Sequence, residues 1–92
     1  MDPYESLERV KDRATFLDFV QALIDDRRDE VAKGSEQPFG HGANGWENGT
    51  IEGYLDAALA WAKDSLGQEN GLPEQPSWQA FATFLYVGKI YE

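Results

Sequence analysis

Hydrophobic residues in the N-terminal third of the chain recur every three or four positions, which is the period of an amphipathic helix. The recurring positions are Phe16, Phe19, Val20, Leu23, Ile24 and Val31. The opposite face carries Asp18, Asp25, Arg28 and Asp29, which is an ordinary solvated set. The pattern therefore predicts one long helix with a single buried face.

A second stripe with the same period follows. Its members are Ile51, Tyr54, Leu55, Ala58, Leu59, Ala62 and Leu66. Trp61 falls at the edge of this stripe beside Tyr54, where we interpret it as a residue that packs in the core or at its rim. The second block is therefore also expected to be an amphipathic helix.

The C-terminal block is apolar around more than half of a helix circumference. Its apolar residues are Trp78, Phe81, Ala82, Phe84, Leu85, Tyr86 and Ile90. A surface helix needs only one apolar stripe, so we expect this last helix to be central. Lys89 projects from the apolar face, where its stem should pack while its ammonium group reaches an acid or the solvent.

Capping residues mark the starts of these helices. Asp12, Thr50 and Ser77 each carry a side-chain oxygen that can accept a hydrogen bond from a first-turn N–H group. Asp2-Pro3 predicts an additional short helical turn at the N-terminus, and Gly34 is the expected end of the first long helix. We predict an all-α fold of three to four helices with the C-terminal helix in the centre.

Two segments rich in Gly, Pro and Asn, residues 34–49 and 67–76, separate the helical blocks. The first is 16 residues long, which is typical of a functional or a floppy loop rather than of a tight connection. No internal repeat interrupts the pattern. We expect residues 1–92 to form one domain.

Composition and charge narrow the possible partners. The chain is 41% hydrophobic and 13% aromatic, has no cysteine, and carries a net charge of -9. Residues 34–92 hold eight acids but only Lys63 and Lys89 as bases. Such a surface repels phosphate backbones and anionic lipid, so we expect no nucleic-acid or membrane partner; a basic protein would be attracted. The simplest role of the charge is solubility.

The compartment is inferred from segments that the sequence lacks. The N-terminus has no basic start followed by an apolar stretch, and no segment approaches the roughly 18 apolar residues of a membrane span. The absence of cysteine suits a reducing environment. A cytoplasmic protein is the expectation.

No set of residues assembles into a catalytic, cofactor or metal site in the sequence. His41 is the one histidine, and it lies in the Gly-rich segment, where it lacks the rigid support of a proton-transfer site. The acids at 25–26 and 29–30 lack metal-ligand spacing and are interpreted as a solvated face. We expect a protein that is not an enzyme and that needs no cofactor.

The aromatic residues near the two Gly-rich segments are the remaining candidates for function. Trp46 is either a lid over the core or part of a binding patch, since tryptophan is both costly to expose and favoured at interfaces. The possible interaction surface comprises Trp46, Glu47, Asn48, Tyr54, Trp61 and Trp78.

Two short motifs carry a resemblance that extends over most of the chain. The helix start Trp46-Glu47-Asn48-Gly49-Thr50 and the C-terminal Lys89-Ile90-Tyr91-Glu92 resemble a family of small acidic bacterial domains of unknown function. In size and charge the chain is also similar to the immunity proteins that neutralise secreted toxins. The resemblance supports the domain boundaries and assigns no activity.

These features lead to three hypotheses. The first is a non-catalytic protein-binding module, of which an immunity-type inhibitor of a basic partner is one form. The second is a homodimer that pairs through the C-terminal helix, with Phe84 and Tyr86 in the interface. The third is a small-ligand binder with a pocket roofed by Trp46 and Trp61.

Overall fold

The computed structural model describes residues 2–33 and 44–91, and these residues form four helices. In chain order the helices are α1 (Pro3–Glu8), α2 (Arg13–Lys33), α3 (Ile51–Asp64) and α4 (Trp78–Ile90). No strand occurs in the described ranges, so the predicted all-α class is confirmed. Within those ranges, no helix is both long and apolar enough to cross a membrane.

The predicted caps start the helices. Asp2 and Asp12 each accept a backbone N–H bond through Oδ1, at 3.0 and 2.9 Å. Thr50 and Ser77 do the same with their hydroxyl oxygens, both at 3.0 Å. Each bond satisfies one of the N–H groups that a first helical turn leaves free. Gly34, the expected end of α2, lies outside the described residues.

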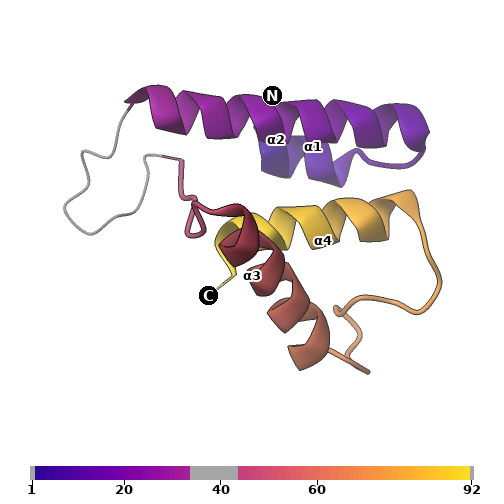
Figure 1. Cartoon of the computed structure of the whole chain (residues 1–92). Coiled ribbons are helices and arrows are strands. Elements are labelled where there is room, and N and C mark those ends of the chain that lie inside the picture. Colours follow the sequence, from indigo (N-terminus) through magenta and orange to yellow (C-terminus); the bar gives the residue numbers. More distant parts are fainter. Residues whose placement is uncertain (1, 34–43, 92) are drawn as a thin grey trace.

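Helix α4 is central, as its apolar circumference predicts. It packs against α1, α2 and α3, whereas α2 and α3, both described in full, do not pack against each other. Figure 1 shows α1 and α4 lying beside α2, and α3 beginning near the C-terminal half of α4 and then running away from α2. Both α2 and α3 therefore use α4 as their support.

The core lies where α1, α2 and α4 meet. Phe19 of α2 and Ala82 of α4 are fully shielded from solvent. The buried core residues are Leu7, Val10, Phe19, Leu23, Trp46 and Ala82. Ala82 of α4 lies in this core, where its methyl side chain takes little room between neighbouring helices.

The helical stripes are wider than the surface that α4 covers. On α2, Ile24 is 40% and Val31 62% exposed; on α3, Ile51, Leu55 and Leu59 are 79%, 54% and 46% exposed. The 3.6-residue period therefore predicted the helices but not which stripe residues are buried. The reason is the arrangement of the helices. An apolar stripe is buried only where another helix packs on it, and α2 and α3 do not pack on each other.

Candidate functional site

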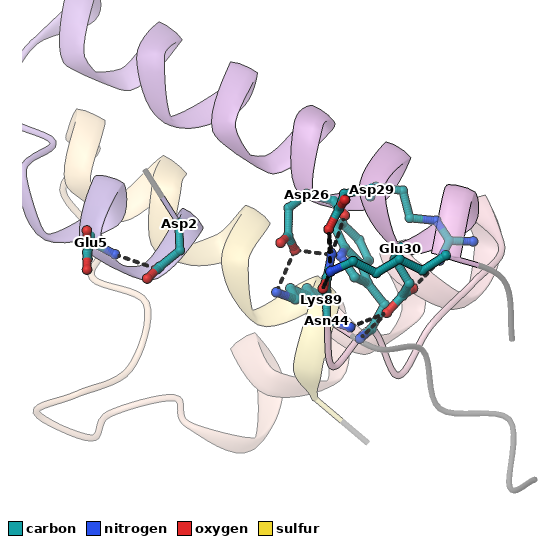
Figure 2. Close-up of polar contacts among 10 residues, drawn as sticks. Asp2, Glu5, Asp26, Asp29, Glu30, Asn44 and Lys89 are labelled. Atoms are coloured by element: carbon teal, nitrogen blue, oxygen red, sulfur yellow. Dashed lines mark hydrogen bonds and ion pairs between the residues drawn. The ribbon is translucent and has the colours of Figure 1, made fainter. Parts of the chain in front are cut away.

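A buried ion pair joins α2 to the C-terminal turn of α4. Lys89 Nζ lies 2.7 Å from Asp26 Oδ2, and the two side chains are only 8% and 16% exposed. Trp46 Nε1 donates to the same carboxylate oxygen at 2.8 Å. Figure 2 shows Asp26 and Lys89 pointing toward each other between the two helices. A charge that far from water is tolerable only when it is paired and hydrogen-bonded, as here.

Glu30, one turn further along α2, holds the segment that leads into α3. Its residue is 5% exposed, and its Oε1 accepts the backbone N–H groups of Asn44 and Trp46 at 3.2 and 3.1 Å. Its Oε2 pairs with Arg27 Nη1 at 2.6 Å. Asn44 Nδ2 donates in turn to the Asp26 carbonyl and to Asp29 Oδ2, at 2.9 and 3.0 Å.

The same segment is bonded to the end of α4. The backbone N–H of Glu47 donates to the Lys89 carbonyl at 2.9 Å. Asn48 Nδ2 donates to the carbonyls of Gly88 and Tyr91, each at 3.0 Å. The carbonyls of Gly88 and Lys89 belong to the last turn of α4, whose acceptors have no partners within the helix, and Tyr91 is the residue that follows the helix. Asn48 thus acts as a C-terminal cap supplied from a distant part of the chain.

Trp46 lies at the centre of this arrangement. Arg27 and Lys89 each place a cationic group 5.5 Å from the centre of its rings, and the residue is 7% exposed. Tyr54 stacks on it at 6.0 Å. We call Asp26, Glu30, Asn44, Trp46 and Lys89 the polar cluster.

Tyr54 connects the polar cluster to α4. Its hydroxyl donates to the Leu85 carbonyl, and burial raises the pKa of Tyr54 to about 12. Gly88 makes this close packing possible, since a Cβ at that position would lie 3.0 Å from the Tyr54 ring and 3.0 Å from its carbonyl oxygen. The tyrosine is therefore neutral at physiological pH and has a structural hydrogen bond.

The buried polar atoms of the polar cluster have hydrogen-bond partners. No buried side-chain nitrogen or oxygen of the described residues lacks a hydrogen-bond partner. No group of three or more His, Cys, Asp or Glu side chains within ranges 2–33 and 44–91 is placed to hold a metal ion. Asp26 Oδ2 and both carboxylate oxygens of Glu30 are engaged in bonds that hold α2, the segment before α3 and the end of α4 together.

An apolar groove of about 500 Å³ opens beside the polar cluster. One wall is α2, the other is the first turns of α3, and Leu85 of α4 contributes to the floor. Most of its lining is aliphatic or aromatic: Val20, Leu23, Ile24, Trp46, Ile51, Tyr54, Leu55 and Leu85. Arg27 and Arg28 supply the positive charge on the α2 side. We call this feature the apolar groove.

The chain was compared with known protein families, curated proteins and solved structures. A family of unknown function, DUF7660, matches residues 12–92. The chain belongs to this family. No curated protein and no solved structure matches it. The DUF7660 match contains the whole polar cluster and the whole apolar groove, and it omits α1.

The sequence-predicted surface of this DUF7660 chain is divided between three places. Trp46, Asn48 and Tyr54 come together, and all three line the apolar groove. Glu47 is half-buried beside them. The other two tryptophans lie elsewhere: Trp61 beside a hollow near Leu72, and Trp78, 37% exposed, against Phe16 with ring centres 5.3 Å apart.

Trp46 and Trp61, which were expected to roof one ligand pocket, line different hollows. Trp46 lines the apolar groove before the first turn of α3, and Trp61 lines a hollow near the end of α3. The expected dimer residues Phe84 and Tyr86 are each half-buried within the chain, and Tyr86 packs edge-on against Tyr4 at 5.9 Å. His41 lies outside the described residues.

Sequence reasoning missed the acids of the polar cluster. Asp26 and Glu30 were interpreted as part of a solvated face, and the burial of Glu30 shows this to be wrong. Their positions carried a usable signal: with Phe19 and Leu23 they continue a single 3.6-residue stripe. A lysine on the apolar face of α4 was the second signal, since a buried cation requires a buried acid.

Proposed function

We propose that this DUF7660 chain is a non-catalytic protein-binding module and that its apolar groove binds an amphipathic helix. The carrying observation is an open, aliphatic groove between two helices that both rest on α4 and do not pack on each other. Helix-in-groove recognition uses this geometry, because a helix presents apolar side chains every three or four residues to a hydrophobic channel.

Exposed aliphatic side chains at the groove support binding. Ile24, Ile51 and Leu55 line the groove, and each is at least 40% exposed. Single exposed apolar residues are common, whereas a contiguous set around a hollow is typical of an interaction site. Covering such side chains contributes about 25 cal/mol for each Å² of apolar surface removed from water.

The ionisable groups at the groove favour binding over acid–base catalysis. The guanidinium groups of Arg27 and Arg28 donate hydrogen bonds and have no acceptor atom, so they suit the recognition of a partner's carbonyl and carboxylate oxygens. Tyr54 has a pKa of about 12 because of burial and does not ionise near neutral pH. A general base needs a pKa near the working pH, and the Tyr54 hydroxyl does not meet this requirement.

Charge on α3 suggests the character of the partner. Glu52 and Asp56 are exposed next to the groove wall, and Glu69 and Glu74 are exposed in the following connection. A partner with basic side chains beside an apolar stripe would be steered toward this side. An immunity-type inhibitor that meets a basic target is one protein of this kind.

Affinity capture with matched variants tests the proposal. The tagged chain should retain a stoichiometric partner from its native lysate at low salt, and Leu55→Arg should lose it. The control is Leu66→Arg, because Leu66 is 70% exposed and lies outside the groove. High salt should weaken capture. Failure of the unmodified chain to retain any partner, a second copy of itself included, or equal capture by Leu55→Arg, would refute the role of the groove.

A further inference from the structure

The apolar groove has walls of opposite charge. On the α2 wall, Arg28 is exposed and forms no ion pair or hydrogen bond with any described residue. On the α3 side, Glu52 and Asp56 are exposed as well. A groove with one cationic and one anionic edge is complementary to a helix that carries the same two kinds of residue in the opposite arrangement.

Helix α3 itself has an exposed apolar stripe with an acidic edge, which is the kind of surface that such a groove could bind. Ile51, Leu55 and Leu59 follow a four-residue spacing and are exposed to 79%, 54% and 46%. With about 3.6 residues per turn, Glu52 and Asp56 fall directly beyond this stripe around the helix. The chain thus presents an exposed amphipathic helix with an acidic edge beside an apolar groove whose Arg28 has no partner among the described residues.

We propose that the occupant of the groove is α3 of a second copy of this chain, so that two copies form a symmetric dimer. This inference rests on the proposed helix-binding role of the groove. In a two-fold interface each contact occurs twice. If one residue of the first copy contacts a second residue of the other copy, the same pair is in contact again with the two copies exchanged. The Leu55 side chains insert between α2 and α3 of the opposite copy, and Arg28 of each copy faces Asp56 of the other.

The dimer explains why these aliphatic side chains lie outside the core. The interior of one chain cannot cover them, because α3 runs away from α2 (Figure 1). A second α3 placed between the two walls covers both stripes at once and brings an acid to the cation that has no partner among the described residues. Opposite charges at matching positions also fix the register of two otherwise smooth apolar stripes.

The dimer surface differs from one centred on Phe84 and Tyr86. Those two side chains are half-buried within a single chain. Ile51 and Leu55 of α3 are more than half exposed, and Leu59 is 46% exposed. The interface is therefore assigned to the α2–α3 groove and to the stripe of α3 beside it.

Sedimentation equilibrium with the full chain tests the dimer. The unmodified chain is expected to dimerise, Leu55→Arg to be monomeric, and Leu66→Arg, the matched control, to dimerise like the unmodified chain. Circular dichroism and thermal unfolding establish that both variants are folded. A strict monomer at concentrations up to about 1 mM, which corresponds to roughly −4 kcal/mol, overturns the proposal, as does a dimer that Leu55→Arg leaves intact.

Charge reversal tests the pairing of Arg28 with Asp56. Arg28→Glu and Asp56→Arg should each raise the dimer dissociation constant at least about tenfold, because like charges then face each other twice. An equal mixture of the two variants should dimerise again, since both pairs are then opposite in sign. A mixture that stays monomeric overturns the pairing. If the chain is monomeric but Leu55→Arg still abolishes partner capture, the dimer fails and the proposed function stands.

Discussion

The polar cluster and the apolar groove share a border at Trp46, yet they treat their side chains in opposite ways. In the polar cluster, Asp26 and Lys89 are buried and every buried side-chain polar atom has a partner. In the groove, Ile51 and Leu55 are apolar and more than half exposed. The first region is complete within one chain, whereas the proposed function gives the second region a partner that covers its exposed side chains.

This difference assigns different roles to the two regions. The polar cluster, together with Asn48, holds residues 44–48, which precede α3, against α2 and against the C-terminal turn of α4. These bonds position the start of α3 relative to α2, and the apolar groove lies between the two helices. Residues of the cluster are expected to govern stability, whereas residues of the groove are expected to govern binding.

Breaking the ion pair of the polar cluster should have the largest effect. Lys89→Met leaves the Asp26 carboxylate buried without its cation, and we expect a loss of about 3–5 kcal/mol in the free energy of unfolding. Urea unfolding measures it. Lys63→Met, at an exposed lysine of α3, is the control and should change stability by less than about 0.5 kcal/mol.

A second variant separates the charge from the packing. Asp26→Asn combined with Lys89→Met should be more stable than Lys89→Met alone, because the uncompensated carboxylate is gone while its shape is kept. A loss below about 1 kcal/mol for Lys89→Met would mean that the pair is not desolvated and that the cluster is not the rigid region.

Crowding the contact between Gly88 of α4 and Tyr54 of α3 should have an intermediate effect on stability. Gly88→Ala places a Cβ 3.0 Å from the ring and the carbonyl oxygen of Tyr54, so we expect a loss of about 1–3 kcal/mol in thermal or urea unfolding. In the control Gly49→Ala the nearest atom is the flexible end of Arg27 at 3.5 Å. Equal stability of the two variants would contradict the close approach of α3 and α4.

Alkaline pH should weaken the fold through Tyr54. Burial raises its pKa from 10.0 to about 12, so the folded state favours the protonated hydroxyl; its contribution is present below pH 10 and is lost as the pH rises toward 12. Tyr54→Phe should therefore lose less stability between pH 10 and 12 than the unmodified chain. Tyr86 and Tyr91 also have raised pKa values, from burial and from a bond to Asp64 respectively, and remain in both proteins. Parallel urea midpoints across this range would refute the prediction.

The smallest effect on stability is expected at the groove. Leu55→Gln should change the free energy of unfolding by less than about 0.5 kcal/mol, because the side chain is already 54% exposed. Leu23→Ala, at a leucine of the groove that is only 7% exposed, should cost about 2–5 kcal/mol. If both leucines contribute equally to stability, the groove is part of the core and not a binding surface.

The sequence determined the parts of this fold that depend on nearby residues. A cap acts on N–H groups three residues away, and the 3.6-residue period acts within one helix, so the starts at Asp2, Asp12, Thr50 and Ser77 were predictable. The central place of α4 was predictable for a related reason, since a helix that is apolar around most of its circumference needs neighbours on several sides.

The tertiary structure decided which members of each stripe are buried and which charges are paired. Asp26 and Lys89 are 63 residues apart, and no local rule brings them to 2.7 Å. The exposure of Leu55 likewise depends on the angle between α3 and α4, because an apolar side chain is buried only where another element covers it. Period and caps are local properties of the chain, whereas the polar cluster and the apolar groove arise from the angles between helices.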